Sequence, residues 1–151
     1  MRLPLALLWM VATGAVVAAD TAAVPTLGFQ TLSEWRDDGQ QSFSLPTDVA
    51  SGTNGTVYLV DSGNNRIVAF DNAGAVAFTF GSSGRGDGEL DGPVGVGVDG
   101  SGRVHVADRG NGRIQVFEDD GAYLNPVPLF VDGAKIEPVD VAVNKEGTEL
   151  F

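Results

Sequence analysis

Two short loops in this sequence carry the same pair of charged side chains at the same spacing. The pairs are Asp61 with Arg66, and Asp108 with Arg113. A carboxylate and a guanidinium at the two ends of a tight loop can form a charge-assisted hydrogen bond across it. Catalysis would need one special copy, whereas this pair occurs twice. We therefore predict that it closes the loop and has a structural role.

Other side chains that could bind a metal or catalyse a reaction lack the neighbouring residues that such a role needs. The only histidine, His105, has no metal-ligand partner nearby in the sequence, and we interpret it as a packed residue. Asp87, Glu89 and Asp91 are spaced like the start of a calcium loop, but its closing glutamate would fall at Val98, which leaves at most a weak divalent-ion site. No serine lies in a nucleophile-elbow motif. We predict no catalytic residue and no resident metal or other cofactor.

The paired loops lie within a longer internal repeat. Residues 55–71 and 102–118 align without a gap, and 8 of the 17 positions are identical at an offset of 47. A proline followed by valines precedes each copy, at 46–50 and 93–98, and occurs again at 138–143. Similarity at a fixed period of roughly 20–50 residues indicates stacked units that bury their apolar faces against one another.

Each period is predicted to form four short antiparallel strands. The expected strands are 46–50, 57–60, 66–70 and 75–80 in the first unit, and 93–98, 104–107, 113–117 and roughly 122–130 in the second. Alternating apolar residues and turns rich in Gly, Asn and Ser support these strands. No window beyond the N-terminal region favours an amphipathic helix. Four strands in about 45 residues are typical of a propeller blade.

The motifs resemble the NHL repeat. The pattern Val-(Tyr/His)-x-x-Asp-x-Gly-Asn-x-Arg-Ile begins at Val57 and again at Val104, and the linker 78–90 is similar to the linker between NHL units. The resemblance covers residues 46–151. It implies an all-β fold, a β-propeller built of four-stranded antiparallel NHL-type blades, and six blades when the propeller is complete.

The resemblance also divides the chain into segments. We expect a leader with a ring-closing strand at 20–45, NHL repeat 1 at 46–92, NHL repeat 2 at 93–137 and the start of NHL repeat 3 at 138–151. The third repeat stops inside its second strand, and three blades cannot close a ring. We therefore expect the N-terminal part of a longer propeller; the alternative is a small protein that forms a ring by oligomerising.

The N-terminus indicates the compartment. A basic start at Arg2, an apolar run from Leu3 to Ala19 and small residues before Asp20 predict a signal peptide at 1–19. The protein is then secreted or periplasmic, with no membrane span after cleavage; an uncleaved anchor helix is the alternative. The sequence contains no cysteine, which excludes a disulfide framework and lipoprotein attachment in this stretch.

Charge narrows the class of partner. The chain has 20 acidic and 9 basic residues and a formal net charge of −11. The NHL propellers that bind RNA do so through a basic face, and no basic cluster is present here. Because neutralisation of phosphates needs lysine and arginine, we predict that the protein does not bind nucleic acid.

A binding scaffold is the function that we favour from the sequence. The loops 62–65, 81–92 and 109–112 should lie together on one face, which would contact a protein, peptide or glycan. The candidate contact residues are Ser62, Asn64, Asn65, Arg85, Asp87, Arg109 and Asn111. Arg85-Gly86-Asp87 spells a cell-adhesion tripeptide, and we interpret this match as a coincidence in a Gly-rich linker.

An enzyme is the alternative that the resemblance leaves open. Some NHL-type propellers are peptidyl-hydroxyglycine lyases, and related six-bladed propellers are metal-dependent lactonases. Such an enzyme would hold its active site, and a divalent metal ion, in the central channel. The predicted innermost strands offer only Asp48 and Asp140 at matching positions, with Gly95 between them.

Overall fold

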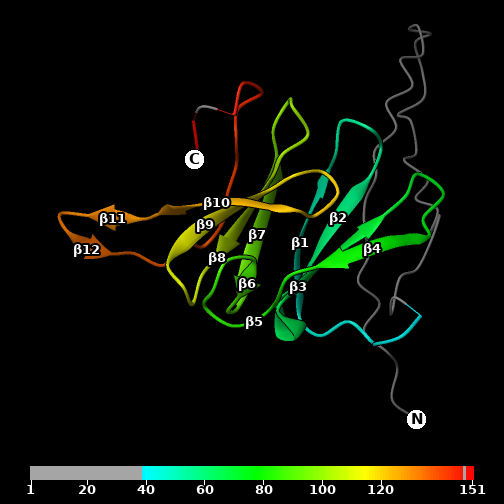
Figure 1. Cartoon of the computed structure of the whole chain (residues 1–151), viewed down its shortest axis with the longest axis horizontal. Coiled ribbons are helices and arrows are strands. Elements are labelled where there is room, and N and C mark those ends of the chain that lie inside the picture. Colours follow the sequence, from blue (N-terminus) through cyan, green and yellow to red (C-terminus); the bar gives the residue numbers. More distant parts are fainter. Residues whose placement is uncertain (1–38, 148) are drawn as a thin grey trace, which may run out of the picture. The chain divides into compact units, whose positions relative to one another are not determined.

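The computed structural model describes residues 39–147 and 149–151, which belong to one compact unit, Arg36–Phe151. The predicted signal peptide at 1–19 and the leader up to residue 38 lie outside the described residues. Two four-stranded antiparallel sheets dominate the described part (Figure 1). Each sheet is one blade, and its strands follow one another in the order of the sequence.

Blade 1 consists of β1 (Pro46–Ser51), β2 (Val57–Asp61), β3 (Arg66–Phe70) and β4 (Val76–Phe80). The short 3-10 helix η1 (Ser62–Asn64) lies between β2 and β3. These strands agree with the predicted ones to within one residue at each end. The Gly- and Asn-containing turns between them explain the agreement, because they interrupt the alternating apolar pattern at fixed places.

Blade 2 repeats this arrangement with β7 (Pro93–Val98), β8 (Val104–Asp108), β9 (Arg113–Phe117) and β10 (Tyr123–Pro128). The first strand of each blade carries a register shift at the same place, between Pro46 and Asp48 in blade 1 and between Pro93 and Gly95 in blade 2. The two copies of the repeat therefore share even this irregularity of the backbone. The strand expected at roughly 122–130 is shorter, since β10 ends at Pro128.

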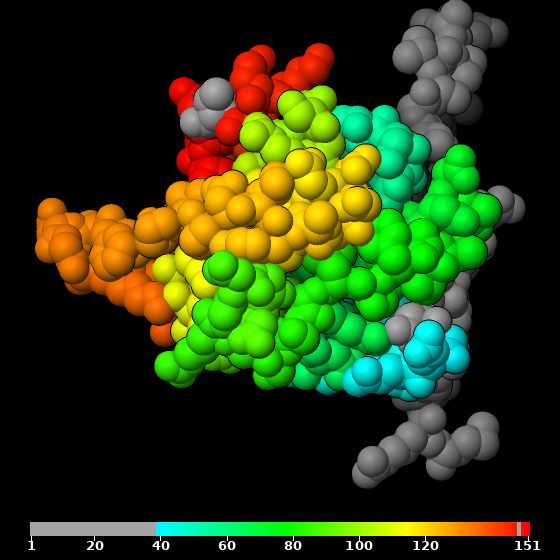
Figure 2. Space-filling view, viewed as in Figure 1, coloured from blue at the N-terminus to red at the C-terminus, as the bar shows by residue number. Residues whose placement is uncertain are grey.

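The linkers after the two blades differ from each other. Between the blades, β5 (Ser82–Ser83) pairs in parallel with β6 (Glu89–Leu90). After blade 2, β11 (Phe130–Val131) and β12 (Ala134–Lys135) form a hairpin, which Figure 2 shows extending away from the sheets. Its turn has positive φ at two successive residues, which suits the Asp-Gly sequence found there.

Residues 138–151 do not contain the regular strand expected at 138–143. Val143 forms an isolated antiparallel bridge with Leu150, and Ala142 exchanges two backbone hydrogen bonds with Phe151. The segment is thus a short hairpin with two ladder positions. A strand has to pair along its length, and residues 138–141 form no such ladder within the part of the chain that the structure describes.

One apolar core joins the two blades. It contains side chains from β2, β3 and β4 of blade 1 together with β7, β8 and β9 of blade 2. The rings of Phe80 and Phe117 meet at 4.9 Å between centroids, and the Tyr58 hydroxyl donates a 2.8 Å hydrogen bond to the Asp119 carbonyl oxygen. Burying large side chains of this kind stabilises the fold by about 1.5–3 kcal/mol each. The two blades therefore pack as one body.

The described residues form an all-β structure. Its helical content is the single turn η1, and no helix among residues 39–147 and 149–151 is long and apolar enough to cross a membrane. On the far side of blade 2, Ile114, Leu129 and Ile136 line an apolar hollow of about 290 Å³ together with part of the 138–151 segment. Apolar surface is thus exposed on one side of blade 2.

Candidate functional site

A buried aspartate ends the second strand of each blade. Asp61 and Asp108 are both 0% exposed, and each lies opposite an arginine in the strand register, Arg66 and Arg113 respectively. Arg66 Nε lies 2.7 Å from Asp61 Oδ2, and Arg113 Nε lies 2.8 Å from Asp108 Oδ2. The structure therefore brings together both pairs singled out in the sequence.

An asparagine completes each pair, and we call the three residues of each blade the Asp–Asn–Arg network. Asn64 Nδ2 donates to Asp61 Oδ2 at 2.7 Å, and Asn111 Nδ2 donates to Asp108 Oδ2 at 2.8 Å. In each blade, one carboxylate oxygen thus accepts at least two side-chain hydrogen bonds. A buried charge is costly unless it is paired and hydrogen-bonded. These bonds therefore allow the charged aspartate to lie in the interior.

The other carboxylate oxygen holds the segment that precedes the blade. The Ser44 N–H donates to Asp61 Oδ1 at 2.7 Å, and the Asp91 N–H donates to Asp108 Oδ1 at 2.8 Å. The carbonyl oxygen of each of these residues accepts a second bond, from Gly63 and Gly110, at 2.8 Å in both blades. Each network therefore ties three segments together: the loop, the following strand and the preceding linker.

A glycine is required where the loop meets the linker. A Cβ placed on Gly110 would lie 2.7 Å from the Asp91 carbonyl oxygen, and one on Gly63 would lie 2.9 Å from that of Ser44. Contacts this short do not occur for real Cβ atoms, and the obstacle is backbone, which cannot give way. This close approach explains the glycine shared by both copies of the Asp-x-Gly-Asn-x-Arg motif.

The arginines also reach the linker. In blade 2, Arg113 Nη2 donates to the carbonyl oxygens of Gly86 at 2.7 Å and Glu89 at 2.9 Å. In blade 1, Arg66 Nη2 donates to the carbonyl oxygen of Gln41 at 3.4 Å. The guanidinium has several donors in one plane, so it can neutralise the aspartate and hold backbone carbonyls at the same time.

The seven predicted contact residues fall into three groups. Asn64 and Asn111 belong to the Asp–Asn–Arg networks. Asn65 joins the η1 loop to the linker, because its Oδ1 accepts a 2.7 Å bond from Gly92 N–H and its Nδ2 donates to Ser83 Oγ at 3.2 Å. The half-buried Ser62 begins η1, while Arg85, Asp87 and Arg109 are exposed. The Arg109 guanidinium pairs with Glu137 at 3.2 Å, where both side chains are more than half exposed.

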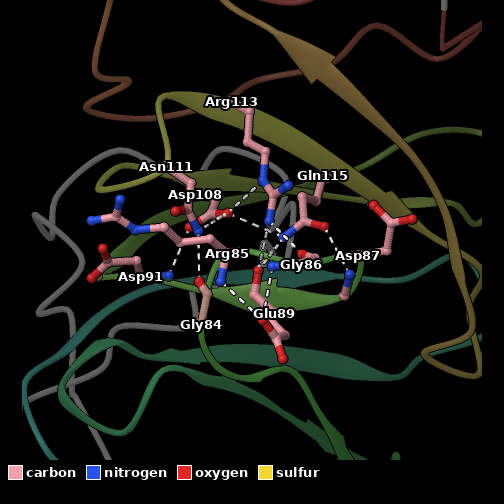
Figure 3. Close-up of polar contacts among 12 residues, drawn as sticks. Gly84, Arg85, Gly86, Asp87, Glu89, Asp91, Asp108, Asn111, Arg113 and Gln115 are labelled. Atoms are coloured by element: carbon pink, nitrogen blue, oxygen red, sulfur yellow. Dashed lines mark hydrogen bonds and ion pairs between the residues drawn. The ribbon is translucent and has the colours of Figure 1, made fainter.

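The three loops lie together at one end of the strands. Besides the bonds of Asn65, Asn111 Nδ2 donates to the Gly84 carbonyl oxygen at 2.9 Å, which connects the 109–112 loop to the 81–92 linker. Figure 3 shows Asp108, Asn111 and Arg113 on one side of that linker. The loops therefore form one polar surface, which we call the loop face. It consists of residues 62–65, 81–92 and 109–112.

Sequence reasoning missed Gln115. It lies in β9, is 0% exposed and occupies the place that Val68 has in blade 1. Its Oε1 accepts a 3.0 Å bond from Gly88 N–H, and its Nε2 donates to the Glu89 carbonyl oxygen at 2.6 Å and to Asp108 Oδ2 at 3.1 Å. The change from valine to glutamine at one repeat position was the available signal.

The carboxylates considered as metal ligands make hydrogen bonds within the protein. Glu89 Oε2 accepts two backbone bonds, from Arg85 and Gly86, and Asp48 Oδ2 accepts a 2.9 Å bond from Val96 N–H, which links β1 to β7. Asp140 Oδ1 accepts a 2.7 Å bond from Val141 N–H. Among the described residues, no three His, Cys, Asp or Glu side chains are arranged to hold a metal ion.

His105 lies at the other end of blade 2. Its Nε2 lies 3.2 Å from Asp99 Oδ2, and Arg103 Nη2 lies 2.7 Å from the same oxygen. The His105 Nδ1 atom is buried and has no hydrogen-bond partner among the described residues. Burial alone would raise the pKa of Asp99, but hydrogen bonds from His105, Arg103 and two backbone N–H groups outweigh it and hold this pKa below its usual value.

Two of the comparisons with known proteins concern the sequence. The family model described as "NHL repeat" matches residues 43–70 and 90–117, which contain both Asp–Asn–Arg networks. No curated protein matches the chain significantly. The chain therefore contains two NHL repeats, and its four-stranded sheets are blades of the β-propeller type.

Solved structures share this fold. The chain is similar to hydrazine synthase of Kuenenia stuttgartiensis (TM-score 0.55, 11% identity, 80% of this chain and 31% of that one). It is also similar to a streptogramin B lyase (TM-score 0.56, 17% identity, 72% and 34%). A Bacteroides thetaiotaomicron protein of unknown function gives a TM-score of 0.56 at 18% identity (68% and 32%). The chain thus spans about a third of the length of each of these structures.

Removal of the network arginine should destabilise its blade. Arg113→Ala leaves the buried Asp108 without its cationic partner, and Arg66→Ala does the same to Asp61. We expect each variant to lose about 1–3 kcal/mol of unfolding free energy, measured by urea denaturation. Arg109→Ala is the control, because its exposed pair with Glu137 should contribute less than about 1 kcal/mol. An Arg113 variant no less stable than the Arg109 variant would contradict the structural role.

Stability should also depend on the ionisation of Asp99. Because its pKa is lower in the folded protein than in the unfolded chain, its stabilising contribution is complete above the ordinary carboxyl pKa of about 3.9 and is lost as the pH falls through the folded value. We therefore expect Asp99→Asn to lower the unfolding free energy at pH 7, and this deficit to shrink on acidification to about pH 3. Urea titrations across this range test it; a deficit that grows towards acid pH would refute it.

Proposed function

We propose that this chain is the blade-forming part of an exported, non-catalytic binding scaffold. Its loop face would contact a protein, peptide or glycan. Export is inferred from the signal-peptide pattern at 1–19, and the binding role from the way the loops are built. The NHL repeat supports the same interpretation, because such repeats often serve as protein-interaction modules.

The observation that carries the proposal is that some charged residues at the loop face are buried in the networks while others are exposed to solvent. The recurring aspartates are fully buried and accept hydrogen bonds on both oxygens. They are thus engaged in holding the loops. The exposed charges of Arg85, Asp87 and Arg109 lie at the surface of loops that these networks fix. A rigid scaffold with variable exposed side chains on its loops is the usual construction of a binding surface.

The enzyme alternative would use a divalent metal ion in the central channel and carboxylates of the innermost strands. In this structure the Asp48 carboxylate binds the β7 backbone, and the Asp140 carboxylate lies against Gly95, where a Cβ would collide with it. These carboxylates are better explained as contacts of β7 with β1 and with the segment that contains Asp140. We therefore favour the scaffold and propose no cofactor.

The charge of the chain supports a protein, peptide or glycan rather than nucleic acid. The formal net charge is −11. Two of the cationic groups near the loop face, those of Arg66 and Arg113, pair with buried aspartates. Few basic groups are then left for phosphates, whose binding depends on lysine and arginine.

The proposal predicts that ligands bind the loop face. A phage-displayed random-peptide library and a glycan array would be screened against the protein. For an enriched ligand, Asp87→Ala/Arg109→Ala should weaken binding about tenfold or more, since charged contacts at the centre of an interface carry much of the affinity. The control is Lys145→Ala/Glu146→Ala, which removes one charge of each sign at the opposite end of the strands. No enriched ligand, or an equal loss in the control, would refute the proposal.

A further inference from the structure

We propose that the loop Gly84–Gly88 is the recognition element of the loop face. We infer that it binds a segment of a partner protein in which an acidic and a basic side chain pair with Arg85 and Asp87. This inference rests on the proposed binding function and specifies its ligand. It comes from the unusual way in which the structure holds this loop.

The loop is first held by a carboxylate within its own linker. Glu89 Oε2 accepts hydrogen bonds from the backbone N–H groups of Arg85 at 2.9 Å and Gly86 at 2.7 Å. The loop is bounded by two glycines with positive φ, Gly84 at 157° and Gly88 at 74°. A Cβ on Gly84 would overlap the Glu89 carboxylate, so this turn depends on glycine there.

Three side chains of blade 2 then bind three further backbone groups of the loop. Asn111 donates to the Gly84 carbonyl oxygen, Arg113 donates to that of Gly86, and Gln115 Oε1 accepts from Gly88 N–H. Figure 3 shows these side chains converging on the loop from one side. The backbone of the loop is therefore fixed by the body of the blade, and its side chains are left to contact a ligand.

Blade 1 has no polar side chain at the position of Gln115. The equivalent residue in β3, Val68, is apolar. Blade 2 has Gln115 at that position, with both ends of its amide bonded to the linker. Burying an amide is unfavourable unless its hydrogen bonds are satisfied. The second blade thus contains a buried polar residue that holds this one loop.

A loop fixed in this way is suited to binding. Little conformational entropy is lost when a preorganised loop meets a ligand, so more of the contact energy appears as affinity. The N–H groups of Arg85, Gly86 and Gly88 are already bonded within the protein. They are not available to pair with a ligand backbone. This arrangement favours recognition through side chains.

The two side chains that the loop presents have opposite charges. Arg85 is exposed, and its guanidinium makes no hydrogen bond or ion pair with the described residues. Asp87 is exposed, and Tyr123 OH donates to its Oδ1 at 3.1 Å, which orients the carboxylate and leaves Oδ2 outside that bond. A guanidinium can bind a carboxylate through two parallel hydrogen bonds, and a carboxylate pairs with an ammonium or guanidinium.

This pair of charges favours a peptide segment over a glycan. A neutral glycan offers hydroxyl groups, whereas a peptide can place an acidic and a basic side chain near each other. The loop Gly84–Gly88 contains no aromatic residue on which a sugar ring would stack. The chemistry of the loop is therefore complementary to a short protein segment with both charges.

The inference is tested by selection on two forms of the protein. The probe is a phage-displayed random-peptide library, selected on the wild type and on the charge-swapped variant Arg85→Asp/Asp87→Arg. Both altered side chains are exposed, and retention of the fold is checked by thermal unfolding. We expect wild-type peptides to contain both charges and to bind Arg85→Ala about tenfold or more weakly. The swapped protein should reject them and select peptides with the two charges in reversed places.

Two further variants separate the possible causes of weaker peptide binding. Gln115→Val introduces the blade 1 residue, which should loosen the loop and weaken the selected peptides severalfold while both exposed charges are kept. Lys145→Ala is the matched cation control and should bind as the wild type does. Peptides that are enriched but insensitive to Arg85→Ala and to the charge swap would overturn this inference and leave the binding function standing. If no peptide or glycan is enriched, the proposed function fails with it.

Discussion

The buried aspartate at the end of the second strand is the interaction on which both blades depend. Its carboxylate lies in the interior, where an unpaired charge would be strongly destabilising. This cost is offset because an arginine, an asparagine and a linker N–H all donate hydrogen bonds to the same carboxylate, as Arg66, Asn64 and the Ser44 N–H do to Asp61. The loop, the third strand and the preceding linker all have to come together for the charge to be satisfied. The same requirement therefore fixes their relative positions.

This constraint explains why the loop face can carry a variable function. The two aspartates at the centre of the networks are buried, whereas the charged side chains of Arg85, Asp87 and Arg109 are exposed on the loops. Blade 2 differs from blade 1, because Gln115 adds an amide to the network around Asp108 and also bonds to the linker. The chain thus uses one repeated network for architecture and one local departure from the repeat to position a particular loop.

Much of the fold could be predicted from the sequence because its determinants are local. The strands β3, β7 and β9 have the bounds that the apolar alternation indicates. The Asp–Arg pairs could be predicted because the register of a tight hairpin places its two ends opposite each other. The early end of β10 and the short hairpin at 138–151 could not be predicted from the sequence, because the pairing partners of a strand decide how far it extends.

The details of the loop face depended on contacts that sequence spacing does not reveal. The bond from Asp91 N–H to Asp108 uses a backbone group, which leaves no trace in residue type. Asparagine is a common residue in surface loops, yet Asn64 and Asn111 each complete an Asp–Asn–Arg network. His105 is packed, as predicted, but its partner Asp99 lies across a turn and has no equivalent in blade 1, where the matching residue is Gly52.

Amide hydrogen exchange tests the role of the buried aspartates most directly. The N–H groups of Ser44 and Asp91 donate to Asp61 and Asp108, so both should exchange slowly although they lie in linkers. In Asp108→Ala, exchange at Asp91 should become fast, while Ser44 in the other blade stays slow. If the Asp91 amide of the wild type exchanges as fast as the exposed turn residue Asn72, the buried aspartate does not hold the linker, and the account is wrong.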